Sequence, residues 1–152
     1  MKLIAMLREN ADELVESAAA ELHRAHLAHY EKVGLEATRE RISALVELTF
    51  ACLEAGSADP VTEWASRVGR ERYDAGYDLL ELQVAVNIVE EAFSQRILAS
   101  IDPENVARYL GLVSAILGMA KDALARTYVS LATEGEPAAP VPEVSDSGGR
   151  QD

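Results

Sequence analysis

The stretch Ala75-Gly76-Tyr77-Asp78-Leu79-Leu80-Glu81-Leu82 carries the clearest structural signal in this chain of 152 residues. Asp78 and Glu81 have the spacing of a capping box, in which each side chain accepts a hydrogen bond from the other residue's backbone N–H at a helix start. Tyr77 before the cap and Leu82 after it have the spacing of a hydrophobic staple. The pattern predicts that one helix ends just before this stretch and that a long helix begins within it.

Further breaks divide the rest of the chain into helical segments. Ala, Leu, Glu and Arg, which favour helix, dominate residues 1–133, and no stretch alternates between apolar and polar residues as a half-buried strand does. Gly34 and Gly56 are expected to end helices. Asp59–Pro60 and Asp102–Pro103 are expected to start them, because Pro is tolerated at the first helical position. We therefore expect five helices, at about residues 2–30, 35–55, 60–74, 79–100 and 103–132.

The start of the first helix stays open between two alternatives. Asn10 and Glu13 have capping-box spacing, which predicts a start near residue 10. Apolar or small residues recur every three or four positions from Leu3 to Ala25, which fits a continuous helix from near Lys2.

The last 19 residues, 134–152, differ from the rest. They hold three of the five prolines and five acidic residues against one basic residue, and they show no helical period. This composition predicts a disordered tail. We therefore expect one helical domain, residues 1–133, followed by the tail. The fold class is all-α, either a five-helix globin-like domain or an irregular helical bundle, and the unequal helix lengths favour the globin-like packing over a regular bundle.

Charge and cysteine content exclude several classes of function. The formal net charge is −12, with 14 Lys and Arg against 26 Asp and Glu, so the surface repels phosphate groups and a nucleic-acid partner is not expected. One cysteine, Cys52, excludes an internal disulfide and a cysteine-rich metal site. No apolar run approaches the roughly 20 residues that span a bilayer, and the N-terminus lacks the pattern of a secretory signal. We expect a soluble cytoplasmic protein without membrane insertion.

The three histidines are the first candidates for a ligand site. His23, His26 and His29 follow one another at steps of three residues within the first expected helix, so neighbouring pairs could share a metal ion. No Glu-x-x-His motif accompanies them, which argues against a di-iron carboxylate bundle. The alternative is a polar edge near a helix end, where His interacts favourably with the helix dipole.

No set of residues points to catalysis. Adjacent acids such as Glu90 and Glu91 point about 100° apart on a helix and cannot face one substrate together. Cys52 lies near a helix C-terminus, where the dipole disfavours a thiolate. The chain has no phosphate-binding loop, nucleophile elbow or dinucleotide fingerprint. We expect a non-enzymatic protein with no cofactor.

Small residues form a stripe on the last expected helix. Gly111 and Gly118 lie seven residues apart inside it, each at a cost of about 1 kcal/mol relative to Ala, and Ala115 and Ala125 extend the stripe. Small side chains let a second helix come close. The stripe therefore serves either close packing inside the monomer or a homodimer interface.

Residues 70–93 and 7–16 resemble the N-terminal domain of RsbR-type stressosome proteins, the RsbRD N-terminal family. The shared pattern is an arginine-rich helix end, a glycine turn, an aromatic residue and a long helix that opens with Leu and Glu. In this chain it comprises Arg72, Gly76, Tyr77, Leu80, Glu81 and Leu82, with Asp78 as the cap. The resemblance implies a globin-like fold, which in this family generally lacks haem. It also implies that the protein forms a dimer and relays a signal to a protein partner. Such domains usually precede an output domain, whereas only the tail follows here, so we expect a free-standing member or a fragment.

These observations lead to two functional hypotheses. The first is a sensory or regulatory domain of bacterial signalling, a homodimer that relays a signal through helix packing and protein contact. The Tyr77–Leu82 corner would be its fixed joint and the last helix its output. The alternative is a metal-, haem- or small-ligand-binding sensor that uses the histidine segment.

Overall fold

The computed structural model describes residues 2–135, and its described part is all-α, as the sequence predicts. It comprises seven helices within those residues: α1 (Lys2–Glu9), α2 (Ala11–Arg24), α3 (Ala28–Val33), α4 (Leu35–Ala55), α5 (Asp59–Asp74), α6 (Leu79–Ser100) and α7 (Pro103–Gly135). The four later helices agree with the sequence prediction to within a few residues. The first expected helix is wrong in its extent, because three helices occupy residues 2–33. Of the two starts left open, the one near residue 10 agrees with the beginning of α2 at Ala11.

The first break falls at Asn10, which does not cap α2 with its side chain. Its side-chain amide instead donates to the carbonyl oxygen of Met6 at 2.7 Å, at the end of α1. Glu13 pairs with Arg96 of α6 rather than with Asn10. The expected capping box is therefore wrong, and the two residues serve other contacts.

The second break lies between α2 and α3. His26 adopts a left-handed conformation there, with φ of 51°, which a non-glycine residue adopts only at some cost in free energy. The break turns α3 back, and Tyr30 of α3 is buried in the core.

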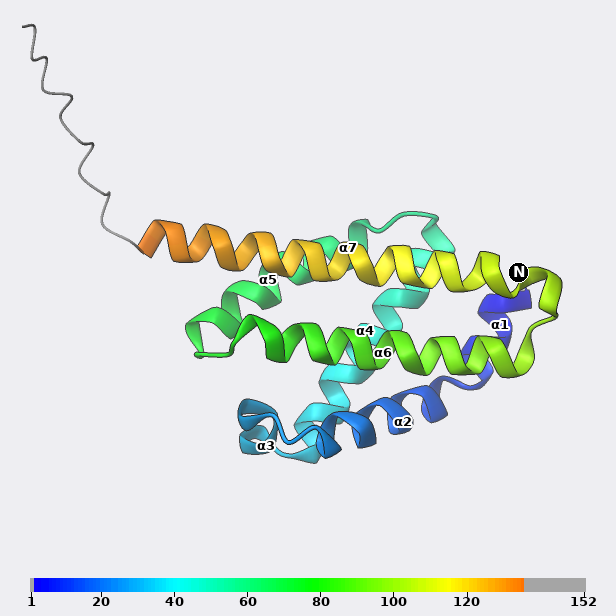
Figure 1. Ribbon diagram of the computed structural model, residues 1–152, viewed down its shortest axis with the longest axis horizontal. Helices are drawn as coiled ribbons and strands as arrows, with labels where there is room; N and C mark the ends of the chain where they lie inside the picture. The colour runs from blue at the N-terminus through cyan, green and yellow to red at the C-terminus, as the bar shows by residue number, and fades with distance from the viewer. Residues whose placement is uncertain (1, 136–152) are drawn as a thin grey trace, which may run out of the picture.

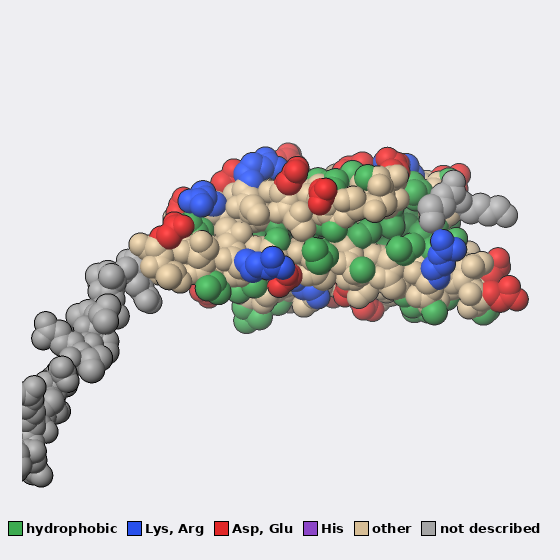
Figure 2. Space-filling model, turned by 90° about the horizontal axis from the view of Figure 1, so that it is seen from above, with side chains coloured by type: hydrophobic (Ala, Val, Ile, Leu, Met, Phe, Trp, Pro, Cys, Tyr) green, Lys and Arg blue, Asp and Glu red, His purple; other side chains and the backbone are tan. Residues whose placement is uncertain are grey.

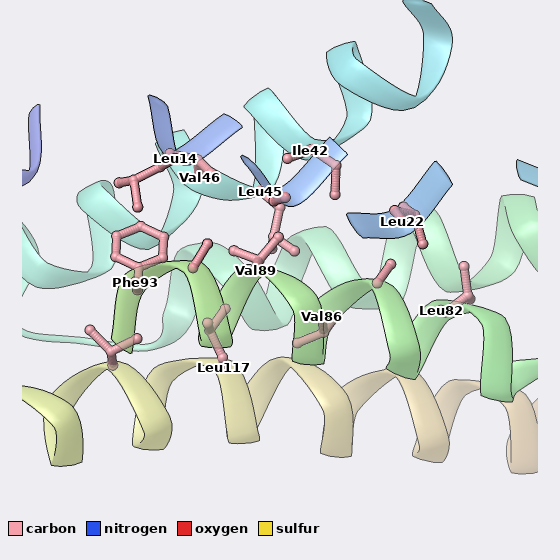
Figure 3. Close-up of a cluster of buried hydrophobic side chains, with 14 of the residues drawn as sticks. Leu14, Leu22, Ile42, Leu45, Val46, Leu82, Val86, Val89, Phe93 and Leu117 are labelled. Carbon is pink, nitrogen blue, oxygen red and sulfur yellow. The ribbon is translucent and has the colours of Figure 1, made fainter. Parts of the chain in front are cut away.

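The helices pack around α4 and α6. In Figure 1, α6 and α7 lie side by side and antiparallel, α2 lies along the other side of α6, and α4 crosses behind. α5 packs along α7. Apolar side chains from four helices meet in the core (Figure 3): Leu14 and Leu22 of α2, Ile42, Leu45 and Val46 of α4, Leu82, Val86, Val89 and Phe93 of α6, and Leu117 of α7.

α7 is the longest helix and ends at Gly135, so residues 134 and 135, assigned to the tail from the sequence, are helical. The rest of that expected tail, residues 136–152, lies outside the described residues. Among residues 2–135, no helix combines the length and apolar character needed to cross a membrane.

Candidate functional site

The corner between α5 and α6 is built as two adjoining helix caps. Gly76 has φ of 86°, which favours glycine because it has no Cβ. Its N–H donates to the carbonyl oxygen of Tyr73, and the N–H of Tyr77 donates to that of Arg72, both at 3.0 Å. This pair of bonds is a Schellman motif, and it satisfies carbonyl groups that the end of α5 would otherwise leave unpaired.

The predicted capping box is present at the start of α6. The Asp78 side chain accepts a hydrogen bond from the backbone N–H of Glu81, and the backbone N–H of Asp78 donates to Glu81 Oε2 at 3.1 Å. The Glu81 side chain also reaches α3, where it accepts from the His29 backbone N–H at 3.2 Å and contacts His29 Nδ1 at 2.8 Å. Glu81 is only 6% exposed, so one buried carboxylate ties α3 to the start of α6.

Tyr77 lies at the centre of this corner and contacts side chains from three helices. Its ring stacks on His29 with centroids 4.5 Å apart and meets Tyr30 edge to face at 5.7 Å. Arg41 Nη1 of α4 donates to its hydroxyl at 2.6 Å. The guanidinium groups of Arg41 and Arg72 lie 5.7 Å and 5.6 Å from its ring centroid, within the range of cation–π attraction.

Tyr128 connects α7 to the same corner. Its hydroxyl donates to the carbonyl oxygen of Tyr77 at 2.8 Å, and its ring meets Tyr73 edge to face at 5.3 Å. Burial raises the pKa of Tyr128 to about 12, so the hydroxyl keeps the proton that it donates. The corner therefore joins α3, α4, α5, α6 and α7.

The histidines do not share one helix, contrary to the expectation. His23 lies in α2, His26 in the turn that follows and His29 in α3. His26 Nδ1 contacts Glu31 at 2.5 Å, and His29 is engaged by Glu81. Among the described residues, no group of three or more His, Cys, Asp or Glu side chains is placed to hold a metal ion. The hypothesis of a histidine metal site stays a prediction.

Cys52 is fully buried in α4, and burial raises the pKa of its thiol. A buried thiol of this kind is the unreactive form of the residue.

The stripe on α7 faces outward. Gly111 and Ala115 are exposed, and Gly118 and Ala125 are half-buried. A Cβ added at Gly111 or Gly118 meets no neighbouring side chain or helix within 4 Å. Close packing of these glycines inside the monomer is therefore wrong as an explanation of the stripe.

The glycine that does allow close packing is Gly69 of α5, which sequence reasoning missed. A Cβ there would lie 3.1 Å from Thr127 Cγ2 of α7. The only signal in the sequence was a glycine inside an expected helix, and that signal is shared with Gly111 and Gly118.

Large apolar side chains on α7 are also exposed: Leu112, Met119 and Val129 are 38%, 45% and 65% exposed. Figure 2 shows several hydrophobic side chains over the middle of one face, with Lys or Arg and Asp or Glu groups beside them.

Sequence reasoning also missed Tyr30, Arg41 and Tyr128. They come from α3, α4 and α7, and they meet only because the three helices converge on Tyr77. A single tyrosine or arginine at a helical position carries no signal of such a contact.

The site therefore combines a helix joint around Tyr77 with an exposed face of α7. The chain matches the family model described as the RsbT co-antagonist protein rsbRD N-terminal domain over residues 8–150, and it belongs to that family. This confirms the resemblance drawn from residues 70–93 and 7–16, and it places the chain among stress-response signalling proteins, which act through protein partners. No curated protein and no solved structure matches the chain.

Proposed function

We propose that this chain is a non-enzymatic regulatory domain that forms a homodimer through the outer face of α7 and relays a signal by a change in helix packing. The observation that carries the proposal is the outward stripe of Gly111, Ala115, Gly118 and Ala125, with nothing packed on its glycines. A second copy of α7 could approach such a surface closely.

The free energy that Gly111 and Gly118 cost the helix supports this function. Glycine inside a helix destabilises it by about 1 kcal/mol relative to Ala, and neither Gly111 nor Gly118 recovers that cost through contacts within the described monomer. The flanking Leu112 and Met119 add apolar area that a second subunit would remove from water.

The corner around Tyr77 supports the relay. Tyr128 anchors α7 to the α5–α6 joint through one hydrogen bond, so a shift of that joint moves α7 with it. The partner is taken to be a protein, because the family description is of a co-antagonist of RsbT. The cytoplasmic location expected from the sequence stays part of this proposal.

The test measures the mass of the full chain by sedimentation velocity. We expect wild type to sediment as a dimer and Gly118→Leu and Gly111→Leu to sediment as monomers. Both substitutions place Leu in open space at a helical position, so each variant should be at least as stable as wild type and loss of the dimer would not reflect unfolding.

Ala44→Leu is the matched control, because Ala44 is exposed on α4, away from the stripe. It adds a similar apolar side chain and should leave the dimer intact. A folded dimer in both glycine variants, or a monomeric wild type, would reject the proposed interface.

A further inference from the structure

An apolar groove adjoins the outer face of α7. It lies between that helix and the turn that joins α4 to α5, and its volume is about 230 Å³. From α7 it is lined by Leu112, Ala115, Ile116 and Met119. A cavity of about 150 Å³ is large enough to hold benzene, so the groove has room for a long apolar side chain.

Charged residues lie at both ends of the same face of α7, and residues 109–120 between them contain none. Arg108 and Asp122 lie seven residues before and after Ala115, and Glu104 and Arg126 lie eleven residues before and after it. At about 100° per residue, seven residues make nearly two turns and eleven make just over three. The five side chains therefore project from one side of the helix, and all five residues are exposed.

The order of these charges is complementary to itself. In two copies of α7 that run antiparallel and cross at Ala115, Arg108 is level with Asp122 of the second copy. Glu104 is level with Arg126 of the second copy, about 16 Å from the crossing point. Two parallel copies in register would instead place like charges opposite each other at all four positions, which is repulsive.

The partners of these charges within one chain leave the same pairing open. Asp122 pairs with Arg126 of its own helix. Among the described residues, neither Glu104 nor Arg108 forms an ion pair. An antiparallel second copy would give both of them an opposite charge.

The antiparallel arrangement also brings an apolar side chain to the groove. Gly111 and Gly118 project to one side of Ala115. Leu112 and Met119 project to the other side, where the groove lies. Met119 of the second copy is then nearly level with Leu112 and lies over the groove. Both side chains are partly exposed in the single chain, so this contact removes apolar area from water.

We propose that two copies of this chain dock antiparallel along α7 and that Met119 of each copy fills the groove of the other. Arg108 then pairs with Asp122 of the second copy. Glu104 likewise pairs with Arg126 of the second copy. The inference rests on the proposed homodimer and adds its orientation and its contacts. The interface is isologous, because each copy contributes the same groove and the same side chain.

Disulfide cross-linking of the full chain tests the orientation. Arg108→Cys and Asp122→Cys chains, one of them carrying a mass tag, are mixed and oxidised, and we expect a cross-link between the two variants. Arg108→Cys alone should give none, because its two copies lie about 21 Å apart along the helices and a disulfide needs Cα atoms within about 7 Å. Wild type is the control, because its one cysteine, Cys52, is buried.

Met119→Ala tests the groove contact. It should raise the dimer Kd, measured by sedimentation over a series of concentrations, at least about tenfold, because it shortens the side chain in both grooves. Val129→Ala is the matched control. Val129 is also exposed on α7 but lies about 21 Å along the helix from Ala115, so the dimer Kd should stay at the wild-type value.

A charge exchange tests the ion pairs. Arg108→Asp should raise the dimer Kd at low salt at least about fivefold, because it sets two carboxylates opposite each other at two places in the dimer. Adding Asp122→Arg in the same chain should recover most of that loss, because the pair forms again with its signs exchanged.

The outcomes separate this inference from the homodimer itself. A cross-link of Arg108→Cys with itself, and none with Asp122→Cys, would overturn the antiparallel docking and leave a dimer along α7 standing. So would the absence of any cross-link while wild type sediments as a dimer. An unchanged dimer Kd in Met119→Ala would overturn the groove contact. A monomeric wild type would overturn both this inference and the proposed function.

Discussion

Replacing Glu81 by Gln tests whether the α5–α6 corner depends on one buried carboxylate. The wild-type side chain accepts from the backbone N–H groups of His29 and Asp78 and contacts His29 Nδ1. A glutamine amide keeps one acceptor oxygen and turns an NH₂ donor toward groups that themselves donate. The substitution changes charge and hydrogen bonding while it preserves the volume of the side chain.

The expected loss follows from the number of bonds affected. A hydrogen bond to a charged group contributes about 1.5–3 kcal/mol, and a buried donor left unpaired costs about 1–3 kcal/mol. Because the amide oxygen retains part of the network, we expect Glu81→Gln to lower the free energy of unfolding by about 2–4 kcal/mol. That is a large share of the roughly 5–15 kcal/mol that stabilises a typical domain.

Urea unfolding, followed by circular dichroism and by Trp64 fluorescence, measures the change. Glu91→Gln is the matched control, because Glu91 is exposed on the same helix and, among the described residues, its side chain bonds only to Gln95. It should change stability by less than about 0.5 kcal/mol. If the two variants unfold at the same urea concentration, the Glu81 carboxylate does not hold the corner together.

Three further predictions use the same unfolding assay or a simple chemical probe. Gly69→Leu should destabilise the chain by about 1–3 kcal/mol through overpacking against Thr127, whereas stability equal to wild type would contradict close packing there. The pKa of Tyr30 is about 12 in the folded chain against 10.0 for a free phenol, so its contribution to stability is full below pH 10 and is lost as pH rises toward 12. Tyr30→Phe should therefore reduce the dependence of unfolding free energy on pH in that window by up to about 1.4 kcal/mol per pH unit, and an unchanged slope would contradict this. Cys52 should react with a thiol reagent only after urea unfolds the chain, because burial hides the thiol and raises its pKa; fast reaction of the folded chain would contradict its burial.

Local signals in the sequence predicted the helices that have their own caps. Asp78 and Glu81 specify the start of α6 through contacts three residues apart, and Gly56 ends α4 with a left-handed conformation. These contacts lie within one turn of helix, so the sequence alone contains them. Asn10 and Glu13 marked the start of α2, but their capping box does not form, because the two residues take partners in α1 and α6 instead of each other. The break between α2 and α3 had no such local signal, because it depends on the left-handed conformation of His26.

In the candidate site, too, the features within one helix turn were predicted and the contacts between helices were not. Tyr77 and Glu81 were predicted from their positions in the cap, but their roles as contacts to His29 and Arg41 depend on how α3 and α4 fold back. Three glycines show most clearly what the sequence alone could not predict. Gly69, Gly111 and Gly118 carry the same sequence signal, and only the packing of α5 on α7 tells that the first is buried and the other two face outward.

The corner and the outer stripe meet on one short part of α7. Tyr128 bonds to Tyr77, and Gly118 lies on the outward stripe of the same helix, within about 15 Å along it. A change in the packing around Tyr77 therefore reaches α7 through Tyr128. If such a change shifts α7, the corner and the second subunit are linked thermodynamically, so whatever favours one packing of the corner must change the dimer affinity by the same factor by which dimerisation favours that packing. The ratio of the dimer Kd of Tyr128→Phe to that of wild type measures this factor, and a ratio of one would mean that the corner and the interface work independently.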